Sequence, residues 1–266
     1  MSVCPWSISA VVECHIGLTH SSIRRITLTL ITVSRSASKL QTLLLERNIL
    51  QSTIDAHLTI IEGDIRDQHS VAKTLAPPSK STNGTANAAV QLIISGIGRP
   101  PIFSPNPLNP TFDDPTICQD AVSSILSALQ SLPSSPKKPL IVALSTTGIS
   151  SQGRDIPIAM VPLYHWLLAV PHKDKKAMEG LLLAEMTKAV PERAIEDFVI
   201  IRPSLLTDGK RLGTEKVRVG EEGKEAAKPA VGYTISRDDV GGWIFDEIVK
   251  GAGGKKFGGK MVSITY

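Results

Sequence analysis

The sequence predicts an α/β fold built around a mostly parallel sheet. Short runs rich in β-branched residues alternate with segments of helical period, and the runs are apolar throughout. Such strands belong to a parallel sheet covered by helices on both faces, and right-handed crossovers make it doubly wound, as in the Rossmann type. The expected strands are Ile26–Val33, Leu58–Glu62, Val90–Ser95, Leu140–Leu144, Phe198–Ile201 and Met261–Thr265, with Ser7–Glu13 as a further candidate.

The expected helices are marked by apolar periodicity and by capping residues. The first is Ser36–Leu50, whose apolar face is formed by Leu40, Leu43, Leu44 and Ile49. Asp114 can cap a later helix whose first position suits Pro115, and Ser236 can cap the last one. The other helices are Asp67–Leu75, Lys173–Ala189 and Asp238–Lys250. Loops or surface excursions are expected at Pro77–Asn87, Arg99–Pro115 and Asp208–Gly232.

Composition excludes several classes of function. The chain has 266 residues, of which 42% are hydrophobic and 20% charged, as in one large or two small globular domains. Aromatic residues make up 4%, which disfavours a surface that stacks sugars or bases. The net charge of +4 is too mild to indicate a nucleic-acid or anionic-membrane partner. We therefore expect a small-molecule substrate.

The cysteines and the apolar runs bear on the compartment. Cys4, Cys14 and Cys118 cannot form a disulfide framework, and no Cys or His cluster has zinc spacing, so no metal is expected. No apolar run approaches the roughly 20 residues of a membrane span. The N-terminal apolar run is interrupted by Glu13 and lacks a basic leader. We expect a cytoplasmic protein; the sequence gives no indication of its oligomeric state.

Small, polar or glycine residues follow several of the expected strands. Ligands of doubly wound sheets bind beyond the carboxyl ends of the strands, where such residues leave room. An alternative explanation is that turns favour these residue types anyway. Their recurrence at five strand ends favours a site, formed by Ser34-Arg35, Gly63-Asp64, Ser95–Gly98, Ser145–Gly148 and Arg202–Leu205.

Two of these strand ends suggest contacts to a nucleotide. Arg35 can pair with a 2′-phosphate, with Ser36 and Lys39 beside it, which favours NADP(H) over NAD(H). The alternative is that Arg35 merely starts a solvated helix. Asp64 can accept from an adenine amino group, or it is a plain turn residue followed by the helix cap Asp67.

The later strand ends carry the candidate chemistry. Ser145 and Thr146 end a strand deep in the sheet, where a hydroxyl can polarise a substrate carbonyl. Lys175 opens the next helix, where an ammonium can bind a ribose and lower the pKa of a proton donor. Further candidates for acid–base work are His165, His172 and Tyr164, although a lone histidine is more often structural.

Taken together, the motifs resemble the atypical short-chain dehydrogenase/reductases of the NmrA-like, NAD(P)H-binding type. Within them the chain is most similar to a fungal subgroup that includes averufin-oxidase-like oxidoreductases of polyketide pathways. The matching pieces, in the family's order over most of the chain, are VSRSASKL (33–40), IIEGDIRD (60–67), ISGIGRPP (94–101), DPTICQDAV (114–122), LSTTGIS (144–150), PLYHWLLAVPHKDKKAME (162–179), IIRPSLLTDG (200–209) and GYTISRDDVGGWIF (232–245).

The resemblance implies one NAD(P)-binding domain over residues 1–266, with a substrate lobe from about 150–172 and 205–235. Together with the strand-end positions it implies catalytic roles for Ser145, Thr146 and Lys175. The implied cofactor-binding residues are Gly17, Arg35, Ser36, Lys39, Asp64, Ser95, Gly96, Gly98, Arg202 and Pro203.

Two departures from the family pattern matter. The glycine-rich turn after the first strand lets backbone amides approach a pyrophosphate; in residues 8–19 only Gly17 remains, as a possible third glycine, and Glu13, Cys14 and His15 stand where small residues are needed. Either the N-terminus reflects an aberrant gene model or splice form, or tight cofactor binding has been lost. In the YxxxK pair of typical members, Lys175 matches the lysine but Pro171 occupies the tyrosine position.

The resulting hypothesis is an NADP(H)-dependent reductase of a small carbonyl or quinone-like metabolite in fungal secondary metabolism. The cofactor would carry the hydride chemistry, while the protein orients the reactants. The alternatives are a nucleotide-sensing regulator, as other NmrA-like members are, and a pseudoenzyme, which the missing glycines suggest.

Overall fold

The computed structural model describes most of the chain, in residues 9–17, 25–76, 90–98, 112–133, 137–223, 228–251 and 253–266. It divides into two compact units, the first formed by Met1–Gly98, Asp120–Ile141 and Glu185–Glu196 and the second by Arg99–Gln119, Val142–Ala184 and Asp197–Tyr266. Both segments of the predicted substrate lobe belong to the second unit. The predicted loop Pro77–Asn87 and most of Arg99–Pro115 lie outside the described residues.

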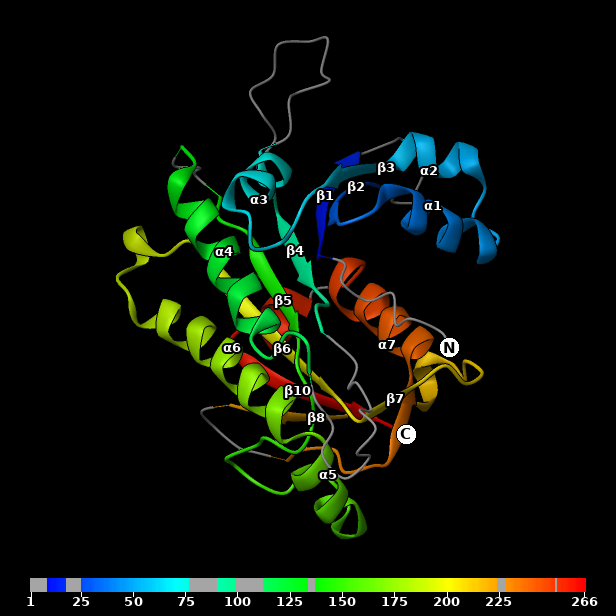
Figure 1. Ribbon diagram of the computed structural model, residues 1–266, viewed down its shortest axis with the longest axis vertical. Coiled ribbons are helices and arrows are strands. Elements are labelled where there is room, and N and C mark those ends of the chain that lie inside the picture. Colours follow the sequence, from blue (N-terminus) through cyan, green and yellow to red (C-terminus); the bar gives the residue numbers. More distant parts are fainter. Residues whose placement is uncertain are drawn as a thin grey trace. The chain divides into compact units, whose positions relative to one another are not determined.

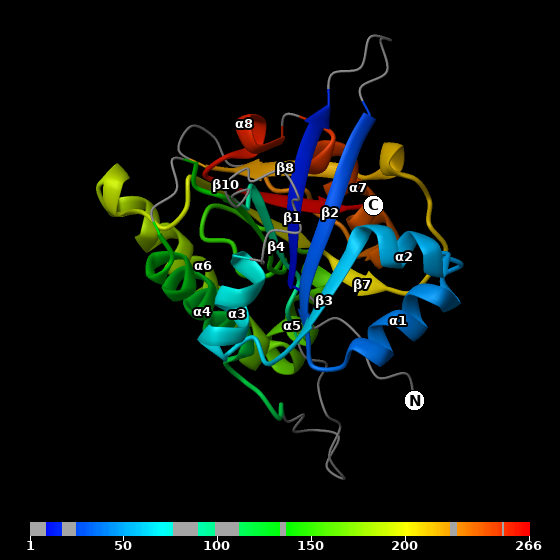
Figure 2. The same cartoon turned by 90° about the horizontal axis from the view of Figure 1, so that it is seen from above.

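The strands of the first unit have the order β3-β2-β1-β4, labelled in Figure 1. β2 (Arg25–Ser34) and β3 (Leu58–Glu62) are parallel, as predicted. β1 (Ser9–Gly17) lies beside β2 in Figure 2 and is antiparallel to both β2 and β4 (Leu92–Ser95). A parallel pair needs a crossover of about a dozen residues or more, and only residues 18–24 separate β1 from β2. The short connection explains the reversed strand.

The first helix is shorter than the sequence predicted. α1 (Ala37–Glu46) ends where Asn48 adopts a φ of 60°, a left-handed conformation that asparagine tolerates. Of the predicted apolar face, Leu40 is buried, whereas Ile49 is 37% exposed. A separate helix, α2 (Gln51–His57), which the sequence analysis missed, leads directly into β3.

The caps of the next two helices differ in origin. α3 (Gln68–Leu75) is capped as predicted by Asp67, which accepts from His69 N and Ser70 N. α4 (Ile117–Ser131) begins after the predicted first position, Pro115. Its first amides are instead bound from outside the helix: both carboxylate oxygens of Asp174 accept at 2.9 Å, one from Cys118 N and one from Gln119 N.

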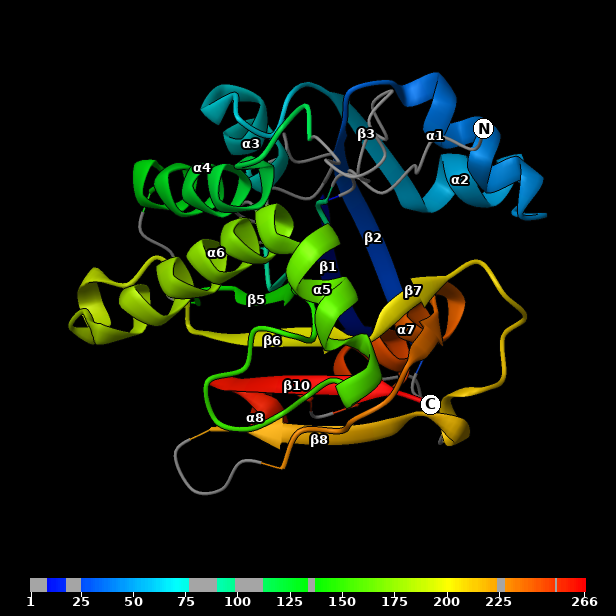
Figure 3. The same cartoon turned by 60° about the horizontal axis from the view of Figure 1, so that its bottom comes forward.

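The strands of the second unit, which takes over β5 (Leu140–Leu144) from Val142 onward, have the order β5-β6-β10-β8. β6 (Asp197–Pro203) and β10 (Lys260–Thr265) are parallel, and Figure 3 shows them beside the antiparallel β8 (Arg218–Glu222). β8 corrects the predicted surface excursion Asp208–Gly232, because the strand pairs with β10 and buries Glu222. A small parallel sheet of β7 (Leu205–Thr207) and β9 (Thr234–Ser236) was not predicted.

The helices of the second unit depart in part from the prediction. α5 (Val161–Leu167) was not predicted, and α6 (Ala169–Thr187) begins before the predicted start, Lys173. α7 (Arg237–Trp243) is capped by Ser236 as predicted and continues as a π-helix, η4 (Ile244–Val249), before the short α8 (Gly253–Phe257). Among the described residues, no helix combines the length and apolar character that crossing a membrane requires.

The predicted α/β fold with a mostly parallel central sheet is confirmed, with β1 and β8 as its antiparallel strands. Along β5 and β6 the hydrogen bonds advance together, from Ser145 N to Ile201 O and from Thr147 N to Pro203 O, as in a parallel pair. The interior is closely filled by aliphatic side chains of these strands. Ile93 and Ile141 in the first unit, and Ile200 and Ile264 in the second, are fully buried.

Candidate active site

The carboxyl end of β2 carries the predicted 2′-phosphate site. Arg35 directly follows β2, and Lys39 lies in the first turn of α1; both are exposed. Ser36 caps this helix, since its Oγ accepts a hydrogen bond from Lys39 N at 3.4 Å. Glu62, at the end of β3, accepts from Ala37 N at 2.8 Å. Two exposed cations therefore lie at this edge, near the carboxylate of Glu62, which already accepts a hydrogen bond from the first amide of α1.

Other predicted cofactor residues lie at the same edge of the first unit. Asp64 follows β3, and its Oδ1 accepts from Arg66 N at 2.9 Å, which is the hydrogen bond of a plain turn residue. Ser95 ends β4 and is 2% exposed. Gly96 and Gly98 follow it, and a Cβ placed at Gly98 would meet no atom of the described residues within 4 Å.

Gly17 lies at the opposite edge. It pairs with Arg25 at the amino end of β2, whereas Arg35 follows the carboxyl end of that strand. At roughly 3.3 Å per residue, β2 separates them by about 30 Å. The residue of β1 that pairs with Ser95 is instead Ser9, at the start of the strand. The structure therefore does not place Gly17 in a turn beside the other predicted nucleotide residues.

The end of β5 holds the predicted catalytic hydroxyls. Ser145 N donates to Ile201 O at 2.7 Å, and Thr147 N donates to Pro203 O at 3.1 Å, so this segment is tied to the end of β6. Ser145 is 6% exposed, and its Oγ has no hydrogen-bond partner among the described residues. The Thr146 hydroxyl, by contrast, donates to the carbonyl of its neighbour.

One face of α6 lines this segment. Lys175 Nζ donates to Leu144 O at 2.6 Å, directly before Ser145. His172 and Glu179, one turn to either side of Lys175, lie on the same helix face because residues three and four apart are neighbours on a helix. The structure thus brings Ser145 and Lys175 together at the end of β5, as the sequence predicted.

Two rings, the buried Tyr164 and the half-buried His172, lie against Gly148, which follows Thr147 in this segment. The φ of Gly148 is 90°, and a Cβ there would lie 2.6 Å from Tyr164 and 2.9 Å from His172. The two rings are tilted at 52°, with centroids 5.6 Å apart. Burial raises the pKa of Tyr164, whose hydroxyl is held by the side chain of Thr147 and the backbone of Leu205. Burial, helped by His165, lowers the pKa of His172 to about 4.

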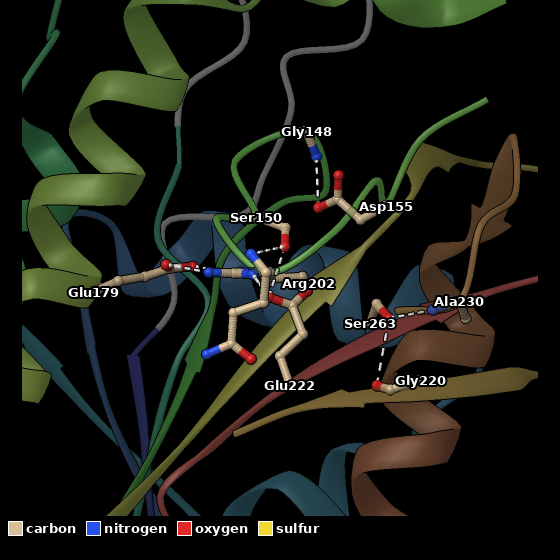
Figure 4. A network of polar contacts seen from close by, with 10 residues as sticks. Gly148, Ser150, Asp155, Glu179, Arg202, Gly220, Glu222, Ala230 and Ser263 are labelled. Atoms are coloured by element: carbon tan, nitrogen blue, oxygen red, sulfur yellow. Dashed lines mark hydrogen bonds and ion pairs between the residues drawn. The ribbon is translucent and has the colours of Figure 1, made fainter. Parts of the chain in front are cut away.

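Arg202 is not available to a cofactor, which corrects the sequence prediction. It is 3% exposed. It donates to both oxygens of Glu179, at 2.9 and 2.7 Å, and to Glu222 Oε2 at 2.8 Å. Ser150 donates to the same Glu222 oxygen at 2.7 Å (Figure 4). All three guanidinium nitrogens of Arg202 thus donate to buried carboxylates. Pro203 accepts from Thr147 N through its backbone carbonyl.

The sequence analysis missed Asp155 and Glu222. Asp155 is 3% exposed and accepts from Gly148 N at 2.9 Å, as Figure 4 shows, and burial raises its pKa. Glu222 lies in the predicted surface excursion Asp208–Gly232, where a carboxylate is ordinarily solvated, and Asp155 lies in the predicted substrate lobe. The available sequence signal was the arginine at the end of a predicted strand, since a guanidinium that is buried there requires carboxylate partners.

The chain is similar to two curated fungal proteins. It is 48% identical over 239 residues to Reductase pytE of Aspergillus terreus, a match that covers 88% of this chain and 87% of the relative. It is 37% identical over 249 residues to Oxidase pynE of Aspergillus niger, covering 85% of each. No protein-family model matches the chain.

Solved structures resemble the fold at low sequence identity. A short-chain dehydrogenase/reductase of Veillonella parvula in complex with NADP aligns with a TM-score of 0.52 and 16% identity, covering 86% of this chain and 89% of that one. ChuY, an anaerobillin reductase of Escherichia coli O157:H7, aligns with a TM-score of 0.50 and 16% identity, covering 88% and 82%. Both matches bear on the fold alone.

Proposed function

Because the chain belongs to the family of the fungal reductase pytE and oxidase pynE, and is thus an oxidoreductase of short-chain dehydrogenase/reductase-like type, we propose that it is an NADP(H)-dependent reductase of a small carbonyl or quinone-like metabolite. The proposal includes its finer placement among NmrA-like, averufin-oxidase-like proteins of fungal secondary metabolism. That placement is supported by the ordered sequence motifs and by the fungal origin of both relatives. The complex of the Veillonella parvula structure with NADP supports the cofactor class.

The observation that carries the proposal is the pairing of Lys175 with the end of β5. Lys175 Nζ binds Leu144 O, and the next residue presents the unpartnered hydroxyl of Ser145. When bound, a nicotinamide cofactor supplies the hydride. Ser145 would donate a hydrogen bond to the substrate carbonyl, and the ammonium of Lys175 would favour negative charge developing on that oxygen.

The described residues fit one end of NADP(H) better than its middle. Arg35 and Lys39 are exposed cations with the charge and position that suit a 2′-phosphate, with the Ser36 hydroxyl between them. A pyrophosphate needs several free amides at a turn before a helix. The segment expected to supply them is instead the strand β1, with Gly17 at the far edge of the sheet. The proposal therefore assigns no residue to the pyrophosphate.

A second candidate, a protein that has lost productive cofactor binding, is favoured by this reversal of β1. Ser9–Val12 pair with both β2 and β4, so their amides are committed to the sheet. Such a chain would keep the fold and the β5 site without turning over NADPH. The two candidates differ in one measurable property, cofactor-dependent turnover.

NADPH oxidation, followed at 340 nm with a panel of aromatic aldehydes and quinones, separates them. We expect turnover that Lys175→Met lowers by about 10²-fold, since electrostatic stabilisation of a developing oxyanion is commonly of that size. The matched control is Lys176→Met, which removes an exposed neighbouring cation and should leave the rate unchanged. A rate that survives Lys175→Met contradicts the proposed site; no turnover with either nicotinamide cofactor supports the second candidate.

A further inference from the structure

Two buried polar atoms, one directly after β5 and one on α6, have no hydrogen-bond partner among the described residues. Ser145 Oγ and His172 Nε2 make no hydrogen bond to any described residue. A buried hydroxyl or imidazole without a partner destabilises the folded protein, so such atoms are rare in native proteins and call for an explanation. A third unpartnered atom, Glu222 Oε1, belongs to the carboxylate already bound by Arg202 and Ser150.

The backbone places the first two atoms along one short segment. Lys175 Nζ contacts Leu144 O, immediately before Ser145. His172, one helical turn earlier on α6, approaches Gly148, three residues after Ser145. α6 therefore runs beside residues 144–148, and Ser145 lies between the two points at which the helix touches them.

The ring of His172 is held in place from the side. Tyr164 packs against it at a centroid distance of 5.6 Å, and the Tyr164 hydroxyl is itself fixed by Thr147. Gly148 has no Cβ, and any Cβ there would collide with both rings. The imidazole can therefore lie close to the segment after β5 because residue 148 is a glycine.

We propose that Ser145 Oγ and His172 Nε2 form a two-point hydrogen-bonding site for one neutral oxygen of the substrate, a carbonyl or a hydroxyl. This site rests on the proposed function and deepens it. Pro171 occupies the position of the family's usual tyrosine, and His172 would supply a hydrogen-bonding group in its place. His172 would hold the oxygen rather than supply a proton, since a neutral imidazole is a hydrogen-bonding group and a very weak acid.

The surroundings favour a neutral ligand over an anion. Burial is the main reason for the low pKa of His172, and the nearby His165 adds to it, so the imidazole is uncharged at neutral pH. A carboxylate ligand would require the imidazole to take up a proton in a site that disfavours its charged form. The charged groups that share this helix face are already engaged, Lys175 by a backbone carbonyl and Glu179 by Arg202.

The test is a binding experiment that needs no cofactor and no turnover. The full chain, labelled with ¹⁵N-histidine, is titrated with 2-acetylnaphthalene, a neutral ketone, and with 2-naphthoate, a carboxylate on the same rings. The signal of His172 among the six histidines is assigned by its loss in His172→Phe, which keeps a ring beside Tyr164. We expect the ketone to shift the Nε2 resonance of His172 while the ring stays neutral, and to bind more tightly than the carboxylate.

The variants give the second readout. Ser145→Ala and His172→Phe should each weaken ketone binding by roughly 3–10-fold, the worth of one neutral hydrogen bond. His165→Gln is the matched control, an exposed histidine one helix away, and should leave the dissociation constant unchanged. An unmoved His172 signal at saturation, or one that moves to the protonated form with naphthoate, overturns the proposal. If His172→Phe fails to fold, His172→Gln assigns the signal instead. The titration of the unmodified chain then decides, and its result stands if the turnover assay fails.

Discussion

Arg202 binds Glu179 through two parallel hydrogen bonds, Nε to Oε1 at 2.9 Å and Nη2 to Oε2 at 2.7 Å, with both side chains almost fully buried. The remaining nitrogen, Nη1, reaches Glu222 on β8. One guanidinium thus binds two carboxylates, one from the helix α6 and one from the edge strand β8. Such pairs add little net stability over apolar packing, but breaking one leaves an uncompensated buried charge.

Replacing Arg202 should therefore be far more damaging than removing a surface cation. We expect Arg202→Met to lower the free energy of unfolding by about 3–5 kcal/mol, because Glu179 and Glu222 are left buried and facing each other. Lys256→Met, which breaks an ion pair to Glu247 whose side chains are 59% and 40% exposed, should cost less than about 1 kcal/mol. Urea denaturation of both variants checks this; equal losses would show that the buried network is not an electrostatic unit.

Gly148 and Gly180 should respond to alanine in opposite directions. Gly148 has a φ of 90°, and an added Cβ would lie within 3 Å of Tyr164 and His172, so Gly148→Ala should destabilise by roughly 2 kcal/mol or more. Gly180 lies inside α6, where a Cβ would meet nothing within 4 Å. Gly180→Ala should therefore stabilise the protein by about 0.5–1 kcal/mol. Thermal melting of the pair tests both signs, and a neutral Gly148→Ala would mean that the rings near β5 are free to move apart.

The elements that sequence predicted best are those whose apolar runs have sharp ends. β3 and β5 span the predicted residues Leu58–Glu62 and Leu140–Leu144, because the polar residues or glycine after each run stop the strand. The direction of β1 could not be read from its composition. It depends on the length of the connection to β2, a topological constraint that residue types do not carry.

The candidate site was predictable where it depends on position along a strand or helix. Ser145 follows from the end of β5. Lys175 was predicted to open the next helix; it lies instead within α6, which begins at Ala169, and still contacts the end of β5. Arg202 met the same positional criterion, yet it is structural, because its partner Glu222 lies 20 residues away on a strand that reads as a charged loop. Which polar residues are buried together depends on long-range packing, and short motifs do not encode it.

Acid should weaken the fold through His172. Its pKa falls from 6.5 to about 4 on folding, so between these values the unfolded chain binds more protons. The free energy of unfolding is therefore unaffected by His172 above pH 6.5. It falls progressively as the pH is lowered towards 4, by up to roughly 2–3 kcal/mol. His172→Gln should flatten this part of the curve of unfolding free energy against pH, whereas His165→Gln should keep most of it, because burial is the main cause. Identical curves for His172→Gln and the unmodified chain would assign the slope to other groups.

Arg35 should set the preference between the two nicotinamide cofactors. Arg35→Asp removes one or two charge-assisted hydrogen bonds to the 2′-phosphate, which we expect to cost about 2–4 kcal/mol for NADPH. NADH, which lacks this phosphate, should change much less. The ratio of kcat/KM for the two cofactors reports the difference, and saturation-transfer NMR reports it if turnover is absent. Equal losses for both, or none, would remove Arg35 from the cofactor site.

NADPH should bind this chain weakly, with a dissociation constant in the high micromolar range or above. In β1, residues 13–17, where the glycine-rich turn was expected, are paired with β2 as a strand, so they do not form the turn whose amides would meet a pyrophosphate. Losing about two amide–phosphate contacts costs on the order of 3 kcal/mol, which takes a typical micromolar site to this range.

Titration calorimetry measures this dissociation constant directly, and Gly17→Ala is the discriminating variant. Gly17 pairs with Arg25 at the edge away from Arg35, so its replacement should leave NADPH binding unchanged. In a pyrophosphate turn the same Cβ would block close approach of the backbone. A sub-micromolar constant that Gly17→Ala abolishes would therefore mean that β1 and the residues after it form the phosphate turn after all.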